Sequence, residues 1–124
     1  MSTSTLGSIL LGSNDPVRLH AWYQAALHPK HTPDGFMIFG GVNVLIDRRS
    51  DIGATNPEPG RMILNFHVDD AHTLAAHLTT LNVTWLVELE ERSDGLFGTL
   101  VDPDGNYIQI IQLTEAYHAR QKPA

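Results

Sequence analysis

The chain has 124 residues, a formal net charge of −6 and no cysteine. This length suffices for one compact domain with its own hydrophobic core, and the lack of cysteine excludes disulfides and thiolate metal sites. No cluster of basic residues follows the chain to track phosphates, which excludes a typical nucleic-acid-binding surface. No apolar run approaches the roughly 20 residues of a membrane span, and no basic segment precedes the first apolar run as in a signal peptide. We therefore expect a cytoplasmic protein that binds neither nucleic acid nor membrane.

The first half of the chain predicts a strand, a helix and a hairpin. The strand covers residues 6–13, and Asp15 then caps a helix with Pro16 at its first position. The strands 35–39 and 42–47 follow, joined by two glycines as a hairpin. The buried face of the helix is predicted from its apolar stripe, which contains Leu19, Trp22, Tyr23 and Ala26.

The second half repeats this plan with a constant offset of 55 residues, as the pairs Leu11 with Phe66 and Asp15 with Asp70 show. The predicted repeat is strand–helix–strand–strand–strand, with its third strand weak or missing in the first half. In the second half, Asp70 caps a helix. Its predicted strands cover residues 62–68, 84–90, 97–101 and 107–113.

These elements predict one α+β domain over residues 1–124. Module one covers about 6–49, a Pro- and Gly-containing linker about 50–60, module two about 61–113, and a short C-terminal helix 114–122. Two βαβββ modules are expected to form a curved mixed sheet around a cavity, with the helices on the outside.

Strand alternation predicts which side chains face that cavity. Ile9, Leu11 and Phe66 are placed against the helices, whereas Ser8, Asn65 and His67 are placed on the opposite, partly polar face. A mixed apolar and polar concave face is typical of a ligand-binding site.

The segment 101–113 carries the clearest local signal in the chain. Residues 102–106 read Asp-Pro-Asp-Gly-Asn, a strong turn sequence. The strand that follows places Tyr107, Gln109 and Ile111 on one face. Gln109 is thus an uncharged amide at a position that is expected to line the site.

Taken together and in order, several motifs across residues 6–113 resemble the vicinal oxygen chelate superfamily, which includes glyoxalase I, extradiol dioxygenases and bleomycin resistance proteins. The motifs that carry the resemblance are Asp15 before the first helix, Trp22-Tyr23 and Leu27 within it, the segment 64–70 (LNFHVDD), and the turn 102–106 (DPDGN). The resemblance implies the duplicated fold. It also implies a homodimer, because many short members pair.

The same resemblance implies where a metal would bind. Metal-dependent members carry His, Glu or Gln ligands on the first and last strand of each half, at positions that correspond here to about Ser8, Ile46, Ile63 and Gln109. The two isoleucines have no donor atom, serine is a poor ligand, and one neutral amide does not replace the three protein ligands of a catalytic metal. A register error of one residue would replace Ile46 by Asp47 and still leave the set incomplete. We therefore expect no metal and no cofactor.

Other candidate residues were weighed against ordinary structural roles. His67 is the one histidine with an expected pocket role; the other six are expected at the surface. Glu88 would face the cavity, as base or cation ligand, only if the strand turned its Leu86–Glu88–Glu90 face inward rather than that of Trp85, Val87 and Leu89. The ligand-pocket candidates are Ser8, Asn65, His67, Glu88, Phe97, Tyr107 and Gln109.

Three functions are compatible with these residues. The first is a metal-free protein that sequesters or carries a small molecule, as in the bleomycin-resistance branch. The second is a metal-dependent lyase, isomerase or dioxygenase, which the residues at the ligand positions oppose. The third is an enzyme that works in the same cavity without metal, with His67 or Glu88 as general base.

Overall fold

A computed structural model of the protein describes residues 3–123. Its contacts divide the chain into two compact units, of which the first ends at Ala54 and the second begins at Thr55. This boundary lies within the predicted linker. In the part of the chain that the structure describes, no helix is long and apolar enough to cross a membrane.

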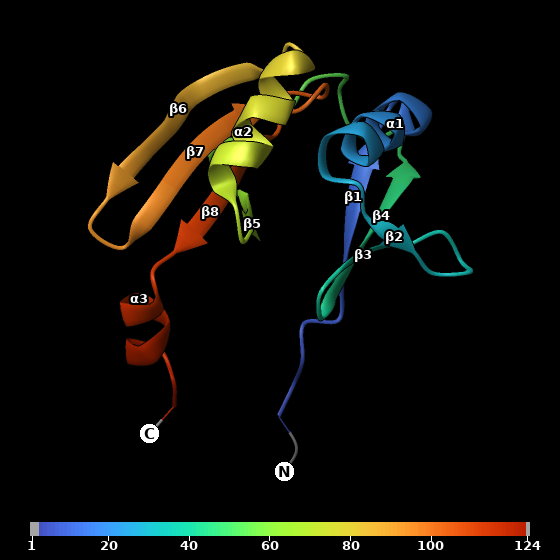
Figure 1. Ribbon diagram of the computed structural model, residues 1–124. Coiled ribbons are helices and arrows are strands. Elements are labelled where there is room, and N and C mark those ends of the chain that lie inside the picture. Colours follow the sequence, from blue (N-terminus) through green and yellow to red (C-terminus); the bar gives the residue numbers. More distant parts are fainter. Residues whose placement is uncertain (1–2, 124) are drawn as a thin grey trace. The chain divides into compact units, whose positions relative to one another are not determined.

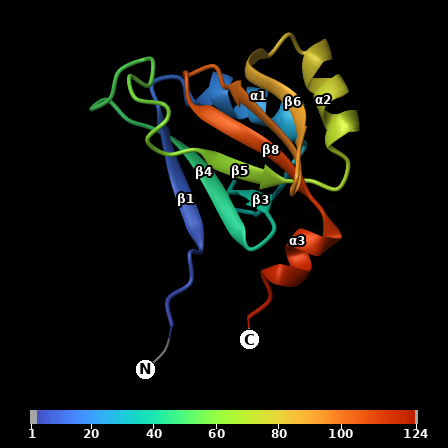
Figure 2. The same ribbon diagram turned by 90° about the vertical axis from the view of Figure 1, so that its left-hand side faces the viewer.

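Unit 1 is a four-stranded mixed sheet with one helix (Figure 1). Its elements are β1 (Ser8–Ser13), α1 (Pro16–Leu27), β2 (Lys30–His31), β3 (Met37–Phe39) and β4 (Val42–Arg48). The strand order is β1-β4-β3-β2, and β1 runs parallel to β4 beside it (Figure 2). The crossover that a parallel pair requires is supplied by α1.

Helix α1 forms as its sequence predicts. The Asp15 side chain accepts a hydrogen bond from the Arg18 backbone N–H at 3.3 Å, and Pro16 occupies the first turn. The helix ends at His28, which takes a left-handed conformation with φ of 49°. Its stripe is buried, since Leu19, Tyr23 and Ala26 are at most 1% exposed.

The prediction for the three strands after α1 was wrong in one respect. The hairpin of β3 and β4 through Gly40 is confirmed, and Gly40 has the positive φ, 62°, that such a turn needs. The weak strand, however, is the first of the three. It is the two-residue β2, in a segment that was expected to be a turn. Pro29 and Pro33 flank it, and proline cannot donate to a strand ladder, so the pairing is confined to the residues between them.

Unit 2 repeats the topology. Its elements are β5 (Leu64–His67), α2 (Ala71–Thr80), β6 (Thr84–Arg92), β7 (Gly95–Val101), β8 (Tyr107–Leu113) and α3 (Glu115–Arg120). The strand order is β5-β8-β7-β6, with β5 parallel to β8, as β1 is to β4 in unit 1. The predicted α+β duplication is therefore confirmed in both strand order and strand direction.

The core of unit 2 lies between α2 and one face of its sheet. Ala71 and Leu78 of α2 and Leu100, Ile108 and Ile110 of the sheet are at most 1% exposed. On the same face, Gln112 Oε1 accepts a hydrogen bond of 2.8 Å from the Ala71 backbone N–H at the start of α2. We call the face opposite the helix of each unit its open face. Tyr107, Gln109 and Ile111 lie on the open face of unit 2, because they alternate with Ile108, Ile110 and Gln112.

The turn 102–106 is held by one buried carboxylate. Asp102 Oδ1 accepts hydrogen bonds from the backbone N–H groups of Asp104 and Asn106, at 2.9 and 3.0 Å, and its Oδ2 accepts one from Asn106 Nδ2 at 2.9 Å. Gly105 has φ of 82°, which glycine adopts without strain. The turn fixes where β8 begins and hence which residues of β8 reach the open face.

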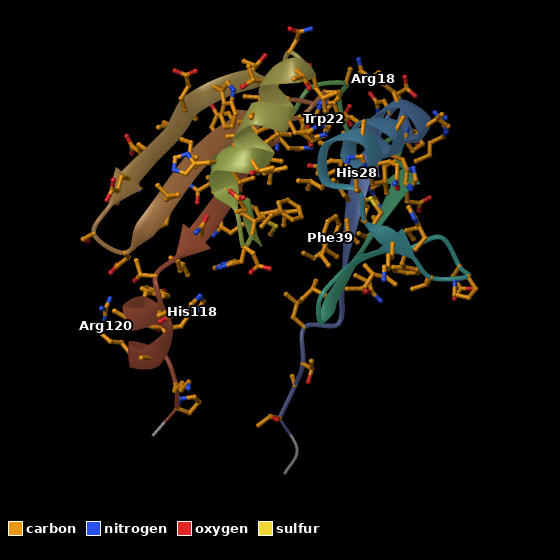
Figure 3. The ribbon with its side chains drawn as sticks, viewed as in Figure 1. Arg18, Trp22, His28, Phe39, His118 and Arg120 are labelled. Carbon is orange, nitrogen blue, oxygen red and sulfur yellow. The ribbon has the colours of Figure 1, made fainter. Side chains whose placement is uncertain are left out.

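Helix α3 is tied to the β6–β7 turn. The Thr114 backbone N–H donates to the Asp94 carbonyl at 2.9 Å, and Arg120 Nη2 pairs with Asp94 Oδ1 at 2.8 Å. Arg120 also lies over the Tyr117 ring, with 5.6 Å from its guanidinium carbon to the ring centroid. Figure 3 shows Arg120 and His118 on opposite sides of this helix.

Candidate functional site

Strand register brings three polar side chains into one row on the open face of unit 2. Asn65 of β5 is paired with Gln109 of β8, which is paired in turn with Thr99 of β7. Gln109 Nε2 donates a hydrogen bond of 3.2 Å to Thr99 Oγ1. Thr99 is buried, Gln109 half-buried and Asn65 exposed. The row thus offers amide donors and acceptors at graded depth.

A second row on the same face combines a histidine with an aromatic ring. His67 is paired with Ile111, and Ile111 with Phe97. The Arg92 guanidinium lies over the Phe97 ring, 5.0 Å from its centroid, and Arg92 is also paired with Glu90 at 2.6 Å. Tyr107 lies at the other end of this face, paired with Val101. The face therefore presents aromatic surface beside groups that form hydrogen bonds.

The open face of unit 1 is more apolar. Ser8 at the start of β1 is paired with Asn43, and Leu10, two residues on, is 53% exposed and paired with Leu45. Ile38 of β3 is 37% exposed on the same face, opposite Asn43.

Pairing also corrects one of the implied metal-ligand positions. With the offset of 55 residues, Leu10 corresponds to Asn65, so its partner Leu45 corresponds to Gln109. The expected position Ile46 is wrong by one residue, because Ile46 pairs with Leu11 on the helix side of the sheet. Asp47 lies two residues beyond Leu45 and pairs with Gly12.

The residues at these positions do not fit a metal. Leu45 and Ile63 are hydrocarbon, Ser8 is a neutral hydroxyl, and Gln109 already uses its amide toward Thr99. Within residues 3–123, no group of three or more His, Asp or Glu side chains is placed to hold a metal ion.

Glu88 lies apart from the row that contains Gln109. It lines a hollow of about 330 Å³ with His72, Thr79, Trp85 and other residues of α2 and β6. The predicted alternation along β6 is wrong, because the pairing with β7 shifts register between Trp85 and Val87 and again between Val87 and Glu90. A hollow of about 350 Å³, which includes Gln112 and Arg92, shares His72 with the first.

One contact between histidines has no counterpart in the sequence pattern. Nε2 of His20 on α1 lies 3.0 Å from Nε2 of His31 on β2. The two residues are 11 positions apart and belong to different elements, so neither helical nor strand periodicity brings them together. The expected surface position holds for His31, which is exposed, whereas His20 is half-buried.

Comparison with solved structures finds the same fold repeatedly. A glyoxylase/bleomycin resistance protein/dioxygenase domain from Frankia sp. EAN1pec is 16% identical, with a TM-score of 0.74 over 91% of this chain and 100% of that one. An enzyme of the glyoxalase/bleomycin resistance protein/dioxygenase family from Burkholderia phytofirmans PsJN is also 16% identical, with a TM-score of 0.72 over 90% of this chain and 100% of that one. The antibiotic binding protein TnmS3 from Streptomyces sp. CB03234 is 18% identical, with a TM-score of 0.66 over 92% of this chain and 99% of that one. At these identities the structures establish the fold alone.

Sequence comparison assigns the family. No curated protein matches the chain. The family model of the glyoxalase-like domain matches residues 8–111, which run from the first residue of β1 into β8. The chain therefore belongs to the glyoxalase-like domain family, within the vicinal oxygen chelate superfamily.

Proposed function

We propose that this protein is a metal-free small-molecule binding protein, which sequesters or carries its ligand without transforming it. The observation that carries the proposal is the composition of the four positions where metal-dependent relatives hold their ion. Here they are Ser8, Leu45, Ile63 and Gln109, of which two have no donor atom. A divalent ion needs about three protein ligands to remain bound at a catalytic site.

The open face of unit 2 supplies the chemistry for such a ligand. Phe97 and Tyr107 offer aromatic surface for stacking. Asn65, His67 and Gln109 offer donors and acceptors within two neighbouring rows of the sheet. A flat, mostly apolar molecule with a few polar substituents matches this pattern. The open face of unit 1 adds exposed Leu10 and the hydroxyl of Ser8.

The similarity of fold to TnmS3, an antibiotic binding protein, supports ligand binding without chemistry as a use of this fold. We extend this use to the present chain, with the ligand on the open face. The protein acts as a homodimer in this proposal, in keeping with short members of the superfamily. Sedimentation equilibrium tests that point separately, and a monomer at all concentrations contradicts it.

The proposal is tested by a thermal-shift screen of antibiotics and aromatic metabolites, repeated after treatment with a chelator. A ligand at 100 times its Kd adds about 2.7 kcal/mol of stability, enough for a clear rise in Tm. We expect the same shift with and without chelator. Loss of the shift on chelation, restored by a divalent metal, contradicts the proposal.

Matched variants locate the site. We expect Gln109→Ala and Asn65→Ala to weaken binding about tenfold, because each removes hydrogen bonds to a buried polar group worth about 1.5 kcal/mol. Glu88→Gln serves as the control, since Glu88 lines the hollow beside α2. A ligand that depends on Glu88 and ignores Gln109 binds elsewhere and refutes the site.

The rival function is catalysis without metal, with His67 as general base. His67 is exposed on the open face, one row from Gln109, where a base would reach a ligand. Mass spectrometry of the ligand after prolonged incubation separates the two. We expect it to be recovered unchanged, whereas a product that His67→Gln abolishes establishes the enzyme.

A further inference from the structure

His20 and His31 form a pair of imidazoles whose facing nitrogens are of the same kind. Their Nε2 atoms are 3.0 Å apart, their ring centroids are 5.0 Å apart, and the ring planes are tilted by 44°. In the metal-free protein one Nε2 carries the hydrogen and the other accepts it. If both rings carry their hydrogens on Nδ1 instead, two lone pairs face the same small space.

The separation of the two nitrogens matches a particular coordination geometry. Imidazole nitrogen binds first-row metals at about 2.0–2.1 Å. Two such ligands at 90° to each other are therefore about 2.9 Å apart, and two at the tetrahedral angle about 3.3 Å apart. The observed 3.0 Å is close to the first value. A 90° angle between nitrogen ligands is typical of tetragonal Cu²⁺ and Ni²⁺.

Both rings are carried by firmly packed backbone. His20 follows Leu19, which is fully buried in the core of unit 1. His31 is paired in register with Met37, which is 1% exposed. Because neither backbone position has to move, binding an ion requires only a change of tautomer. Lys30 is paired with Ile38, whose side chain lies on the open face, so the lysine charge is directed to the other side of the sheet.

The site is also open to solvent. His31 is exposed and His20 half-buried, so an ion held between them keeps water on its remaining positions. Imidazole is neutral near neutral pH and is the side chain best suited to Cu²⁺ and Ni²⁺ at such a surface.

We propose that His20 and His31 form a two-histidine site for one Cu²⁺ or Ni²⁺ ion, on the helix side of unit 1. The site is separate from the proposed ligand face, because both rings lie on the side of the sheet that carries α1. Its existence does not depend on the proposed function. A bound metal here takes no part in binding the small molecule.

Isothermal titration of the full chain with NiCl₂ tests the site. We expect one ion per chain, and a loss of affinity of about 100-fold in both His20→Gln and His31→Gln, the factor gained when two weak ligands act together. The matched control is His118→Gln, which removes an exposed histidine whose ring neighbour is Tyr117, 6.1 Å away between centroids. Equal affinity in all variants, or an equal loss in all three, refutes the proposal.

A second measurement needs no variant. Substoichiometric Cu²⁺ broadens the ring proton resonances of the residues nearest to it, so we expect the signals of His20 and His31 to disappear first. The electron paramagnetic resonance spectrum is expected to show splitting from two equivalent nitrogens. Broadening that begins at other histidines contradicts the assignment, whether or not the glutamine variants fold.

Discussion

At the scale of single residues, Gln109 shows what sequence alone can locate. The turn 102–106 fixes where β8 begins, so the face on which Gln109 lies followed from counting alternate residues and is confirmed. Its partner Thr99 was not predicted, because that contact depends on the register between β7 and β8. The same limitation explains the error at Ile46. One residue of register moves a side chain to the other face of a sheet.

The N-cap of α2 makes a residue-scale prediction about acid stability. Asp70 accepts hydrogen bonds from the Thr73 hydroxyl at 2.7 Å and the Thr73 backbone N–H at 3.1 Å. These bonds, the hydroxyl bond first, lower the pKa of Asp70 below its ordinary value of 3.8. The stabilisation is therefore complete above pH 3.8 and is lost as the pH falls through the lowered pKa. We expect Asp70→Ala to lower Tm at pH 7, and the difference from the wild type to shrink in strong acid.

Asp70→Asn is the control for charge, because asparagine is an equally good N-cap that does not titrate in acid. Its Tm at pH 7 is expected to lie nearer to the wild type than that of the alanine variant. Thermal unfolding followed by circular dichroism from pH 7 to pH 2 measures all three proteins. A difference between Asp70→Ala and wild type that stays constant with pH argues against the role of the carboxylate.

At the scale of elements, the sequence predicted helices better than strands. Both major helices begin at the predicted Asp caps and bury the predicted stripes. Strand β2 was missed because two residues between prolines carry no periodic signal. The face of Glu88 was left open and the alternation of β6 failed, because two register shifts interrupt it. The space for the displaced strand comes from Gly98, whose absent Cβ would lie 3.2 Å from the Trp85 ring and 3.3 Å from Leu89 Cα.

The turn between β6 and β7 depends on a glycine. Gly95 has φ of 151°, and a Cβ there would lie only 2.0 Å from the Gln112 carbonyl oxygen of β8. We expect Gly95→Ala to lower the free energy of unfolding by about 3 kcal/mol, because strain and a backbone clash add together. Urea denaturation measures the change.

Gly41→Ala is the matched control in the other unit, since no heavy atom lies within 4 Å of its would-be Cβ. Its midpoint in urea is expected to stay close to that of the wild type. Equal effects of the two substitutions contradict the argument from close approach.

At the scale of the whole molecule, the internal duplication was the strongest prediction from sequence. The offset of 55 residues is reproduced by the equivalent pairs β1–β4 and β5–β8. The position of the unit boundary was also predicted, from the composition of residues 50–60. The attachment of that segment was not. Asn56 donates from its backbone N–H to the Asp104 carbonyl at 2.8 Å and from Nδ2 to Asn106 Oδ1 at 2.9 Å.

This attachment predicts how the segment responds to protease. Arg61 is well exposed, and its ion pair with Glu58 leaves the backbone as the main restraint on cleavage. We expect Asn56→Ala to speed tryptic cleavage after Arg61 about fivefold, the effect of losing about 1 kcal/mol of side-chain hydrogen bonding. Mass spectrometry of a limited digest follows the fragments. Cleavage after Arg120, far along the chain in α3, is expected to proceed at an unchanged rate.

The meander of β6, β7 and β8 has a consequence for the order of folding. These strands follow one another along the chain and pair with their neighbours through short turns, so closing their loops costs little entropy. The parallel pairs β1–β4 and β5–β8 each require a long segment to close first. Because local contacts form faster than distant ones, we expect the meander to be the nucleus of folding. The strand that carries Gln109 is then already in place when β5 brings Asn65 beside it.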